Sequence, residues 1–217
     1  MKYGVIGASG KLGSEVTNVF AEAGHKLVFT FDIDGEWSES TPKILIDCSL
    51  PSALPETIGF VEKFKTPLVI ATTGLSDKHI KQLKELSKKY PVVQSYNFSI
   101  GIQVLIQLTK KANELLKDWD VEISETHHRF KKDKPSGTAK MIKEIFNKTD
   151  VNVTSKRLGN VPGDHSISFG ALGETISIEH RALSRRTFAE GILLSAEFAL
   201  KKKNGFYSFT NVISEIK

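Results

Sequence analysis

Between Glu125 and Ala139 the chain gathers the side chains best suited to acid–base chemistry. Two adjacent histidines, His127 and His128, are followed by several lysines, and Lys131 is the fourth residue after the first histidine. Imidazole gains and loses a proton near neutral pH, so it can act as a proton donor under physiological conditions. An ammonium group would add a positive charge beside it. This set of groups predicts a site for a small anion next to a proton donor.

The flanking residues predict how this segment is held. Residues 120–126 alternate between apolar and polar side chains, which is typical of a half-buried strand. Residues 135–138, Pro-Ser-Gly-Thr, end the loop and begin a helix that we expect from Thr138 to about Lys148. The N–H groups at a helix start attract anions. Strand, loop and helix start would therefore bring imidazole, ammonium and backbone N–H groups together.

Two other interpretations of the same segment compete with the anion site, a solvated basic loop and a metal site. A solvated basic loop with neighbouring histidines would have a similar composition. A metal site is not expected, because adjacent strand residues point to opposite faces and no Cys or His completes a set at ligand spacing. The order of strand end, histidine pair, lysine and helix start favours the anion site over the plain loop.

A second candidate site lies at the N-terminal end of the sequence. Residues 2–6 predict a buried strand, and Gly7-Ala-Ser-Gly10-Lys-Leu-Gly13 leads from it into a helix ending near residue 23. Glycines at such a turn let the backbone approach a pyrophosphate, although a plain tight turn has similar spacing. The next expected strand, 26–31, ends in Asp32, about 20 residues beyond the loop, where an acidic residue would bind ribose hydroxyls. Together these features predict a dinucleotide site.

Strands and helices alternate through the following residues. Further strands are expected at 43–47, 67–71 and 91–95, and helices at 54–65 and from Ser76 onward. Short connections between alternating elements favour right-handed crossovers, so we expect an α/β fold with a Rossmann-like, doubly wound parallel sheet. Ligands bind at the carboxyl ends of such strands, where Thr72, Thr73 and Asn97 fall.

The pattern changes after residue 98. A long helix is expected at about 100–116, followed by the strand that leads to the histidines. Residues 151–183 are mainly strand-like, notably at 165–169 and 174–180. Consecutive strands without helices predict a smaller α+β region with a mostly antiparallel sheet. A helix at about 186–202 and a tail at 205–213 complete the chain.

Bulk properties restrict the class of protein. Cys48 is the single cysteine of the 217 residues, which excludes an internal disulfide and fits a reducing compartment. No apolar run approaches the roughly 18 residues that span a membrane, and Met1 leads directly into a strand, so we expect a cytoplasmic protein without signal peptide or membrane partner. The net charge is +5, yet the lysines form short scattered groups, so we expect no nucleic-acid partner.

The whole of residues 125–139 resembles the signature of dihydrodipicolinate reductase, Glu-x-His-His-x-x-Lys-x-Asp-x-Pro-Ser-Gly-Thr-Ala. Every specified position is present. Further segments that resemble the family are Thr72-Thr73-Gly74, Asn97-Phe98-Ser99-x-Gly101, Arg157-x-Gly159, Gly163-x-His165 and the run from His180 to Gly191. The resemblance implies a dinucleotide-binding domain of residues 1–97 and 186–217. It implies a substrate-binding and tetramerisation domain of residues 98–185.

The resemblance also implies an activity and roles for single residues. The family reduces 4-hydroxy-tetrahydrodipicolinate to tetrahydrodipicolinate with NADH or NADPH, in the diaminopimelate route to lysine, and forms homotetramers. His127 is then expected to be the general acid and Lys131 its cationic partner. The substrate carboxylates would be held by His128, Ser136, Gly137 and Thr138. The cofactor would be bound by Gly7, Ala8, Ser9, Gly10, Lys11, Leu12, Asp32, Ala71, Thr72, Thr73, Ser95, Tyr96, Asn97 and Phe98. His165 and His180 are expected to be structural.

Departures from the family pattern concern the cofactor. Lys11 replaces the usual arginine, Ala71 replaces a glycine, and Ile33 stands where relatives that use NADPH well have a basic residue. We therefore expect NADH to serve at least as well as NADPH. An amino-acid dehydrogenase on the same plan and a catalytically silent dinucleotide sensor are the alternatives. The Pro-Ser-Gly-Thr loop disfavours the first, and a lysine placed four residues after a histidine disfavours the second.

Overall fold

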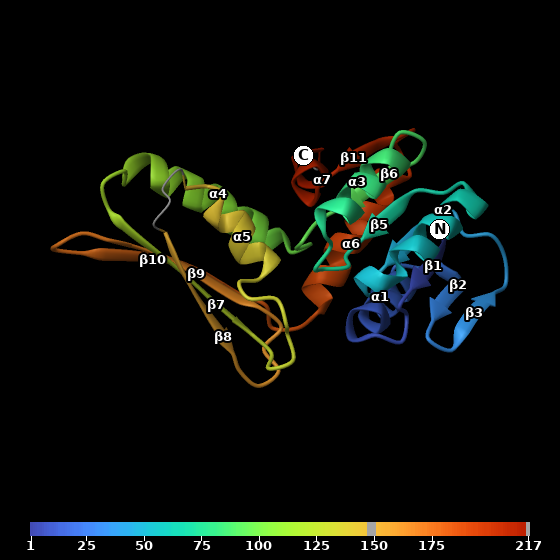
Figure 1. Cartoon of the computed structure of the whole chain (residues 1–217), viewed down its shortest axis with the longest axis horizontal. Coiled ribbons are helices and arrows are strands. Elements are labelled where there is room, and N and C mark those ends of the chain that lie inside the picture. The colour runs from blue at the N-terminus through green and yellow to red at the C-terminus, as the bar shows by residue number, and fades with distance from the viewer. Residues whose placement is uncertain (147–150, 216–217) are drawn as a thin grey trace. The chain divides into compact units, whose positions relative to one another are not determined.

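The structure is a computed structural model that describes residues 1–146 and 151–215. The chain forms two compact units, one of residues 1–98 with 185–217 and one of residues 99–184 (Figure 1). The division expected from the family resemblance, at 97/98 and 185/186, falls next to these boundaries. Which ligand each unit binds is taken up below.

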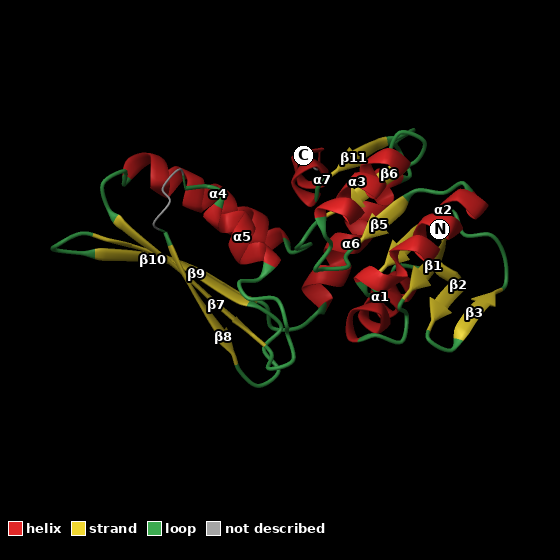
Figure 2. Ribbon diagram, in the orientation of Figure 1, coloured by secondary structure: helices red, strands yellow, loops and turns green. Residues whose placement is uncertain are grey.

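The first unit is built on a seven-stranded sheet with the strand order β11-β6-β5-β4-β1-β2-β3 (Figure 2). All neighbouring strands are parallel except β2 and β3. The strands are β1 (Lys2–Ile6), β2 (Lys26–Asp32), β3 (Gly35–Ser38), β4 (Leu45–Asp47), β5 (Leu68–Ile70), β6 (Pro91–Gln94) and β11 (Gly205–Tyr207). The expected Rossmann-like sheet is confirmed, because the parallel pairs β1–β2, β4–β5 and β5–β6 are each connected through a helix.

Helices cover both faces of this sheet. One core contains apolar side chains of α1 (Lys11–Glu22), α6 (Arg186–Ala199) and α7 (Phe209–Glu215). The other core contains those of α2 (Leu54–Phe64) and α3 (Asp77–Leu86). A short 3-10 turn, Pro51–Ala53, precedes α2. Strands buried on both faces explain why β1, β4 and β5 appear in the sequence as continuous apolar runs rather than alternating ones.

Two elements of the first unit differ from the sequence expectation. β3 was not predicted, because all four of its residues are exposed and so carry no buried apolar face. The tail after residue 205 forms only the short strand β11 and then the helix α7, with Phe209 and Val212 buried three residues apart. Ser208 and Asn211 exchange hydrogen bonds at the start of α7, which is a helix-start signal that the sequence expectation missed.

The second unit packs two helices on one face of a four-stranded sheet with the order β10-β9-β7-β8. Its elements are α4 (Ile100–Leu115), β7 (Asp120–His127), α5 (Gly137–Lys143), β8 (Asn152–Arg157), β9 (Asp164–Gly170) and β10 (Thr175–Arg181). β9 is antiparallel to both neighbours, whereas β8 returns parallel to β7 after the α5 connection. The expected mostly antiparallel sheet is confirmed. α5 ends at Lys143, earlier than predicted, and positions 147 and 148 of that prediction lie outside the described residues.

Candidate functional site

Close packing explains the glycines of the β1–α1 turn. Gly7 has a φ of +81°, and a Cβ there would lie 2.9 Å from the carbonyl oxygen of Cys48. A Cβ on Gly13 would lie 2.0 Å from the carbonyl oxygen of Gly7. Only glycine allows α1 to begin this close to the strand end. Gly10 is the N-cap of α1 and provides no side-chain cap, so the helix start depends on other acceptors for its first N–H groups.

Asp32 closes the turn from the neighbouring strand β2. Its carboxylate accepts hydrogen bonds from the Ser9 hydroxyl at 2.7 Å and from the Ser9 N–H at 3.2 Å. Both residues line a cavity of about 470 Å³. The structure therefore brings together four of the predicted cofactor residues, Gly7, Ser9, Gly10 and Asp32, around one space.

Besides Ile33, the same cavity has lining residues that the sequence expectation gave no role. Ile33 is fully exposed at its edge, and Glu56, in the first turn of α2, adds a second carboxylate to the one on Asp32. Ser49, Leu50 and Ser52 complete the wall contributed by the segment after β4. A sequence signal existed, because residues after a parallel strand lie at the ligand-binding edge of the sheet.

The other predicted cofactor residues are placed in three ways. Lys11 is exposed as the first residue of α1, and Ala8 and Leu12 pack partly against the core. Ala71, Thr72 and Thr73 follow β5, where Thr73 is exposed and the other two are buried. After β6, the Ser95 hydroxyl donates to the carbonyl of Asn97 at 2.8 Å, which fixes the turn that carries Tyr96 and Phe98. These strand-end residues lie outside the lining of the 470 Å³ cavity.

Asp47, at the end of β4, was not singled out from the sequence, yet it organises this edge. Its fully buried carboxylate accepts from the Ser49 hydroxyl at 2.5 Å and the Ser49 N–H at 2.8 Å. It also accepts from the hydroxyls of Thr57 and Thr72, both at 2.8 Å. Burial raises the pKa of Asp47, and these hydrogen bonds counteract that rise. The carboxylate thus joins the ends of β4 and β5 to helix α2.

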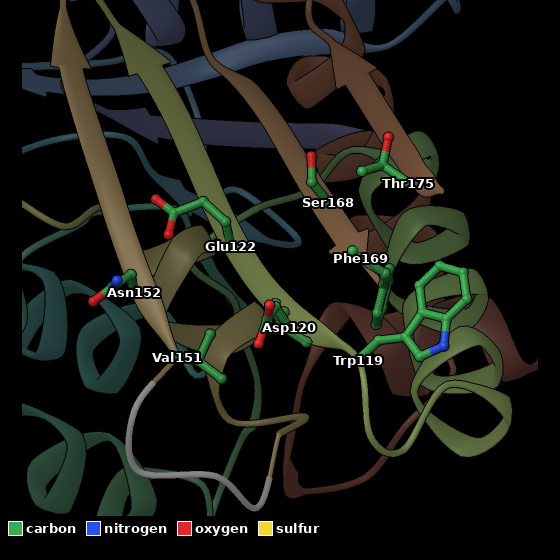
Figure 3. A pocket seen from close by; sticks show the side chains of 10 residues that line it. Trp119, Asp120, Glu122, Val151, Asn152, Ser168, Phe169 and Thr175 are labelled. Carbon is green, nitrogen blue, oxygen red and sulfur yellow. The ribbon is translucent and has the colours of Figure 1, made fainter. Parts of the chain in front are cut away.

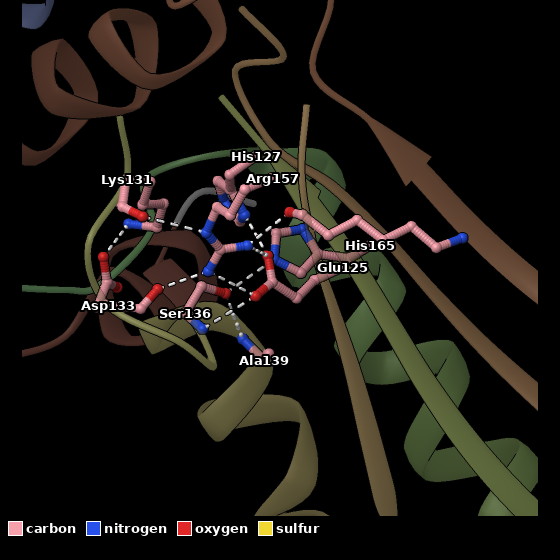
Figure 4. Close-up of polar contacts among 9 residues, drawn as sticks. Glu125, His127, Lys131, Asp133, Ser136, Ala139, Arg157 and His165 are labelled. Carbon is pink, nitrogen blue, oxygen red and sulfur yellow. Dashed lines mark hydrogen bonds and ion pairs between the residues drawn. The ribbon is translucent and has the colours of Figure 1, made fainter. Parts of the chain in front are cut away.

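In the second unit, the predicted proton donor lies at the end of β7. Glu125 and His127 are two residues apart on a strand, so both side chains point to the same buried face. The Glu125 carboxylate is hydrogen-bonded to Nδ1 of His127 (Figure 4). His127 is 6 % exposed and Glu125 is 1 % exposed, so the pair is shielded from water.

Arg157 completes this cluster from the neighbouring strand β8, where it stands opposite His127 in the register. Its Nη1 and Nη2 groups each donate to one oxygen of Glu125 at 2.9 Å. The same guanidinium donates to the backbone carbonyls of Lys131 at 3.2 Å and Asp133 at 2.5 Å. Burial disfavours the charged carboxylate, but the hydrogen bonds from His127 and Arg157 outweigh it and hold the pKa of Glu125 well below its usual range.

Ser136 ties the far end of the loop to the same carboxylate. Its N–H donates to Glu125 at 3.3 Å, and its hydroxyl accepts from the Ala139 N–H at 3.2 Å as the N-cap of α5. The hydroxyl also contacts Nε2 of His165 at 3.4 Å. The N–H groups at this helix start were expected to attract an anionic ligand. In the structure the N–H of Ser136 donates to Glu125 instead.

The other predicted site residues lie in the loop after β7 and in the first turn of α5. The ammonium of Lys131 pairs with Asp133 at 2.8 Å (Figure 4). His128 is half-buried beyond the end of β7, and Gly137 and Thr138 form the first turn of α5. Glu125 thus connects His127 to Ser136 by hydrogen bonds to both. Lys131 lies in the loop whose backbone carbonyls accept hydrogen bonds from Arg157.

The two histidines expected to be structural each contact neighbouring side chains. His165 packs edge-on against His127, with ring centroids 5.2 Å apart, and burial together with the charge of His127 lowers its pKa to about 3. His180 contacts the Ser99 hydroxyl at 3.1 Å, beside the start of α4. A Cβ on Gly101 would lie 2.6 Å from the His180 ring, which explains the glycine in that motif.

Glu125 and Arg157 were part of the patterns read from the sequence, but they were given no role. The signal for Glu125 was its position two residues before a strand histidine, which places an acceptor on the same face. Nothing comparable marked Arg157, because its position opposite His127 depends on the strand register.

A further cavity in the second unit is lined by none of the predicted site residues. It measures about 390 Å³ and is lined by Trp119, Asp120, Val121, Glu122, Val151, Asn152, Ser168, Phe169, Gly170 and Thr175 (Figure 3). Its charged groups are carboxylates, which would repel an anionic ligand. Among the described residues, no group of His, Cys, Asp and Glu is arranged to hold a metal ion. None of the helices in the described part of the chain is both long and apolar enough to cross a membrane.

Comparison with known proteins identifies the family. Residues 34–98 match the family described as dihydrodipicolinate reductase, N-terminus, and residues 101–213 match dihydrodipicolinate reductase, C-terminus. The 4-hydroxy-tetrahydrodipicolinate reductase of Thermosipho africanus is 49% identical over 215 residues, covering 99% of both chains.

Solved structures show the same architecture. A dipicolinate-bound dihydrodipicolinate reductase from Paenisporosarcina sp. TG-14 aligns with a TM-score of 0.75 at 21% identity, over 97% of this chain and 98% of that one. The DAP dehydrogenase of C. glutamicum, in complex with DAP, aligns with a TM-score of 0.57 at 12% identity, over 100% and 96% of the two chains. The fold is thus shared with an amino-acid dehydrogenase, but the sequence matches distinguish the two, and the chain belongs to the dihydrodipicolinate reductase family.

Proposed function

We propose that the protein reduces 4-hydroxy-tetrahydrodipicolinate to tetrahydrodipicolinate with a nicotinamide cofactor, in the diaminopimelate route to lysine. The observation that carries this proposal is the match to one reductase family along nearly the whole chain, with the histidine and Pro-Ser-Gly-Thr segments intact. The reaction removes the hydroxyl of the substrate and one ring hydrogen as water, and it adds one hydride and one proton to the ring. The protein must therefore hold a dicarboxylate, orient the cofactor and supply a proton.

The first unit fits a dinucleotide. Gly7 and Gly10 would let a pyrophosphate approach the backbone at the start of α1. The turn itself is tight, because a Cβ on Gly10 would lie 3.2 Å from the carbonyl oxygen of Gly7. Asp32 would accept hydrogen bonds from ribose hydroxyls, and these would replace the bonds that it now accepts from Ser9. The segments after β5 and β6, residues 71–73 and 95–98, are proposed to bind the rest of the cofactor. Once bound, the nicotinamide supplies the hydride.

The two carboxylates that face this cavity bear on the choice of cofactor. Asp32 and Glu56 would repel a 2′-phosphate, and Ile33 offers no positive charge to offset them. Lys11, at the exposed start of α1, is the nearby cation in the sequence that could compensate. We therefore expect both NADH and NADPH to serve, with NADH at least as good.

The second unit would supply the proton. Nδ1 of His127 is taken by Glu125, so Nε2 is the nitrogen available to a substrate. Nε2 lies beside Gly163, where a Cβ would come within 3.0 Å of it. His127 is the proposed general acid, which typically contributes 10²–10⁴-fold, and Lys131 would stabilise the charge that develops on the ring. His128, Ser136, Gly137 and Thr138 are the proposed carboxylate-binding residues.

A homotetrameric, cytoplasmic enzyme is the remaining part of the proposal, and both properties rest on the family resemblance. One coupled assay tests the function. Pyruvate and aspartate semialdehyde, condensed in place by the preceding synthase, provide the unstable substrate, and cofactor oxidation is followed by absorbance. Turnover that requires both precursors supports the proposal. Cofactor oxidation with amino acids or 2-keto acids instead would point to a different dehydrogenase, and binding without turnover would point to a sensor.

A further inference from the structure

We propose that the buried Glu125–Arg157 ion pair is the positioning element of this site, coupling the protonation of His127 to the shape of the substrate loop. The inference rests on the proposed function, because it assigns His127 as donor and residues 131–138 as the loop. It adds two positioning residues and one physical link between proton delivery and substrate binding.

Glu125 determines the tautomer of His127. An ionised carboxylate only accepts hydrogen bonds, so Glu125 requires a proton on Nδ1 of the imidazole. Neutral His127 then has a bare Nε2, and the protonated ring presents its second N–H from Nε2. The transferable proton is therefore always the one on Nε2, the nitrogen that lies beside Gly163. This use of a carboxylate to fix the tautomer and direction of a histidine is known from other acid–base sites.

Arg157 in turn keeps Glu125 ionised. A buried carboxylate without a cation tends to take up a proton and would then compete as a donor. Arg157 prevents this through two parallel hydrogen bonds of 2.9 Å to the two carboxylate oxygens. A lysine could not replace it at both oxygens, because its ammonium lacks the planar fork.

The coupling to the loop follows from the other bonds of the same two side chains. Arg157 donates to the carbonyls of Lys131 and Asp133, and Glu125 accepts from the N–H of Ser136. These contacts span the loop from its catalytic lysine to the first turn of α5. Because all of them converge on one ion pair, disturbing either partner should change proton delivery and carboxylate binding together.

Several charged or titratable groups belong to the cluster around His127. Glu125 lies on its own strand, Arg157 on β8 and His165 on β9, while Lys131 and Asp133 belong to the loop. His165 stays neutral in the physiological range because burial lowers its pKa to about 3. Glu125 is thus the anionic group in direct contact with the ring, and it stabilises the protonated, donating form. Removing its charge should move the alkaline limb of the activity profile to lower pH.

The tautomer can be tested in the unaltered enzyme. With ¹⁵N-labelled histidine, two-bond correlations between ring nitrogens and ring carbons distinguish a proton on Nδ1 from one on Nε2, and His127→Gln assigns the signals. Above the pH at which the ring becomes neutral, we expect the proton on Nδ1, which is the less common tautomer in free histidine. A proton on Nε2 would overturn the proposal, whatever the variants do.

The coupling is tested with Glu125→Gln and Arg157→Lys. Matched controls are Glu122→Gln, whose side chain lies on the opposite face of β7 and accepts from Thr154, and Arg181→Lys, an exposed residue of β10. Each test variant should lower kcat about ten- to hundredfold, the effect of one charge-assisted hydrogen bond. Each should also weaken inhibition by pyridine-2,6-dicarboxylate about tenfold and leave NADH binding, followed by fluorescence, unchanged.

The outcomes separate this inference from the proposed function. If the wild-type enzyme turns over and His127→Gln does not, the function stands. In that case, unchanged pH profiles and unchanged dicarboxylate inhibition in the two test variants would overturn the positioning role. Loss of kcat without any change in inhibition would overturn the coupling. If either test variant fails to fold by circular dichroism, the tautomer measurement in the wild type still decides.

Discussion

Gly163→Ala is expected to lower kcat by displacing the proposed proton donor, His127, while leaving that residue itself unchanged. The new Cβ would lie 3.0 Å from Nε2 and 3.3 Å from Cδ2 of His127, closer than the 3.4 Å at which ordinary contacts begin. The ring cannot yield freely, because its Nδ1 is bound to Glu125 and its edge packs against His165. His127 must therefore shift by a few tenths of an ångström, and the methyl group would lie directly against Nε2.

The expected magnitude follows from the sensitivity of catalysis to position. A displacement of 1 Å costs about 10²-fold, so a shift of a few tenths together with partial blocking should lower kcat by roughly tenfold or more. Gly170→Ala is the matched control, because its Cβ would meet Thr175 at 3.7 Å, an ordinary contact. The measurements are kcat, KM for NADH and the midpoint of thermal unfolding for both variants. A Gly163→Ala enzyme with full kcat would show that Nε2 is not the atom that faces the substrate.

The other predictions concern separate parts of the site. His127→Ala and Lys131→Ala should each lower kcat about 10²–10⁴-fold, and the double variant should lose less than the product; a single variant that keeps more than about a tenth of kcat would exclude that residue as donor or partner. Ile33→Arg should raise kcat/KM for NADPH relative to NADH, and a wild-type preference for NADPH above about tenfold would contradict the proposed role of the nearby carboxylates. Pyridine-2,6-dicarboxylate should inhibit about ten- to hundredfold better than pyridine-2-carboxylate, whereas equal potency would mean that the loop does not hold two carboxylates. His165, whose pKa falls from 6.5 to about 3 on folding, binds its proton more readily in the unfolded chain, so its contribution to stability is present above pH 6.5 and is lost as the pH falls towards 3. Urea titrations between pH 7 and 4 should show a smaller loss of stability for His165→Gln than for the wild type, and parallel losses would contradict the assignment.

The parallel sheet was predictable because its strands and helices alternate and its glycine turn has a clear sequence pattern. β3 was missed for a physical reason. An exposed edge strand buries neither face, so nothing in its sequence repeats with period two. α7 was missed because its start depends on reciprocal bonds between Ser208 and Asn211, which are local but common in turns as well.

In the candidate site, the order of motifs located the histidine loop, whereas the contacts within it depended on tertiary structure. The sequence shows that Glu125 and His127 share a face of one strand, but the partner of that carboxylate is set by the register of β7 against β8. Similarly, the hydroxyls that satisfy Asp47 come from three different segments, and no spacing rule connects them. For Ser136 the sequence predicted the helix start correctly. It could not show that the N–H of Ser136 donates to Glu125, because that contact depends on tertiary structure.

The buried carboxylate of Asp47 has a consequence for the thermodynamics of cofactor binding. Because it fixes the residues after β4, the start of α2 and Thr72 at the end of β5, these backbone segments are already ordered in the free protein. Binding then loses little conformational entropy at this edge of the sheet. The heat-capacity change on binding should correspond to the apolar surface buried by the cofactor, without the larger negative value that accompanies the folding of a loop. The first unit should therefore bind its nucleotide as a preorganised receptor.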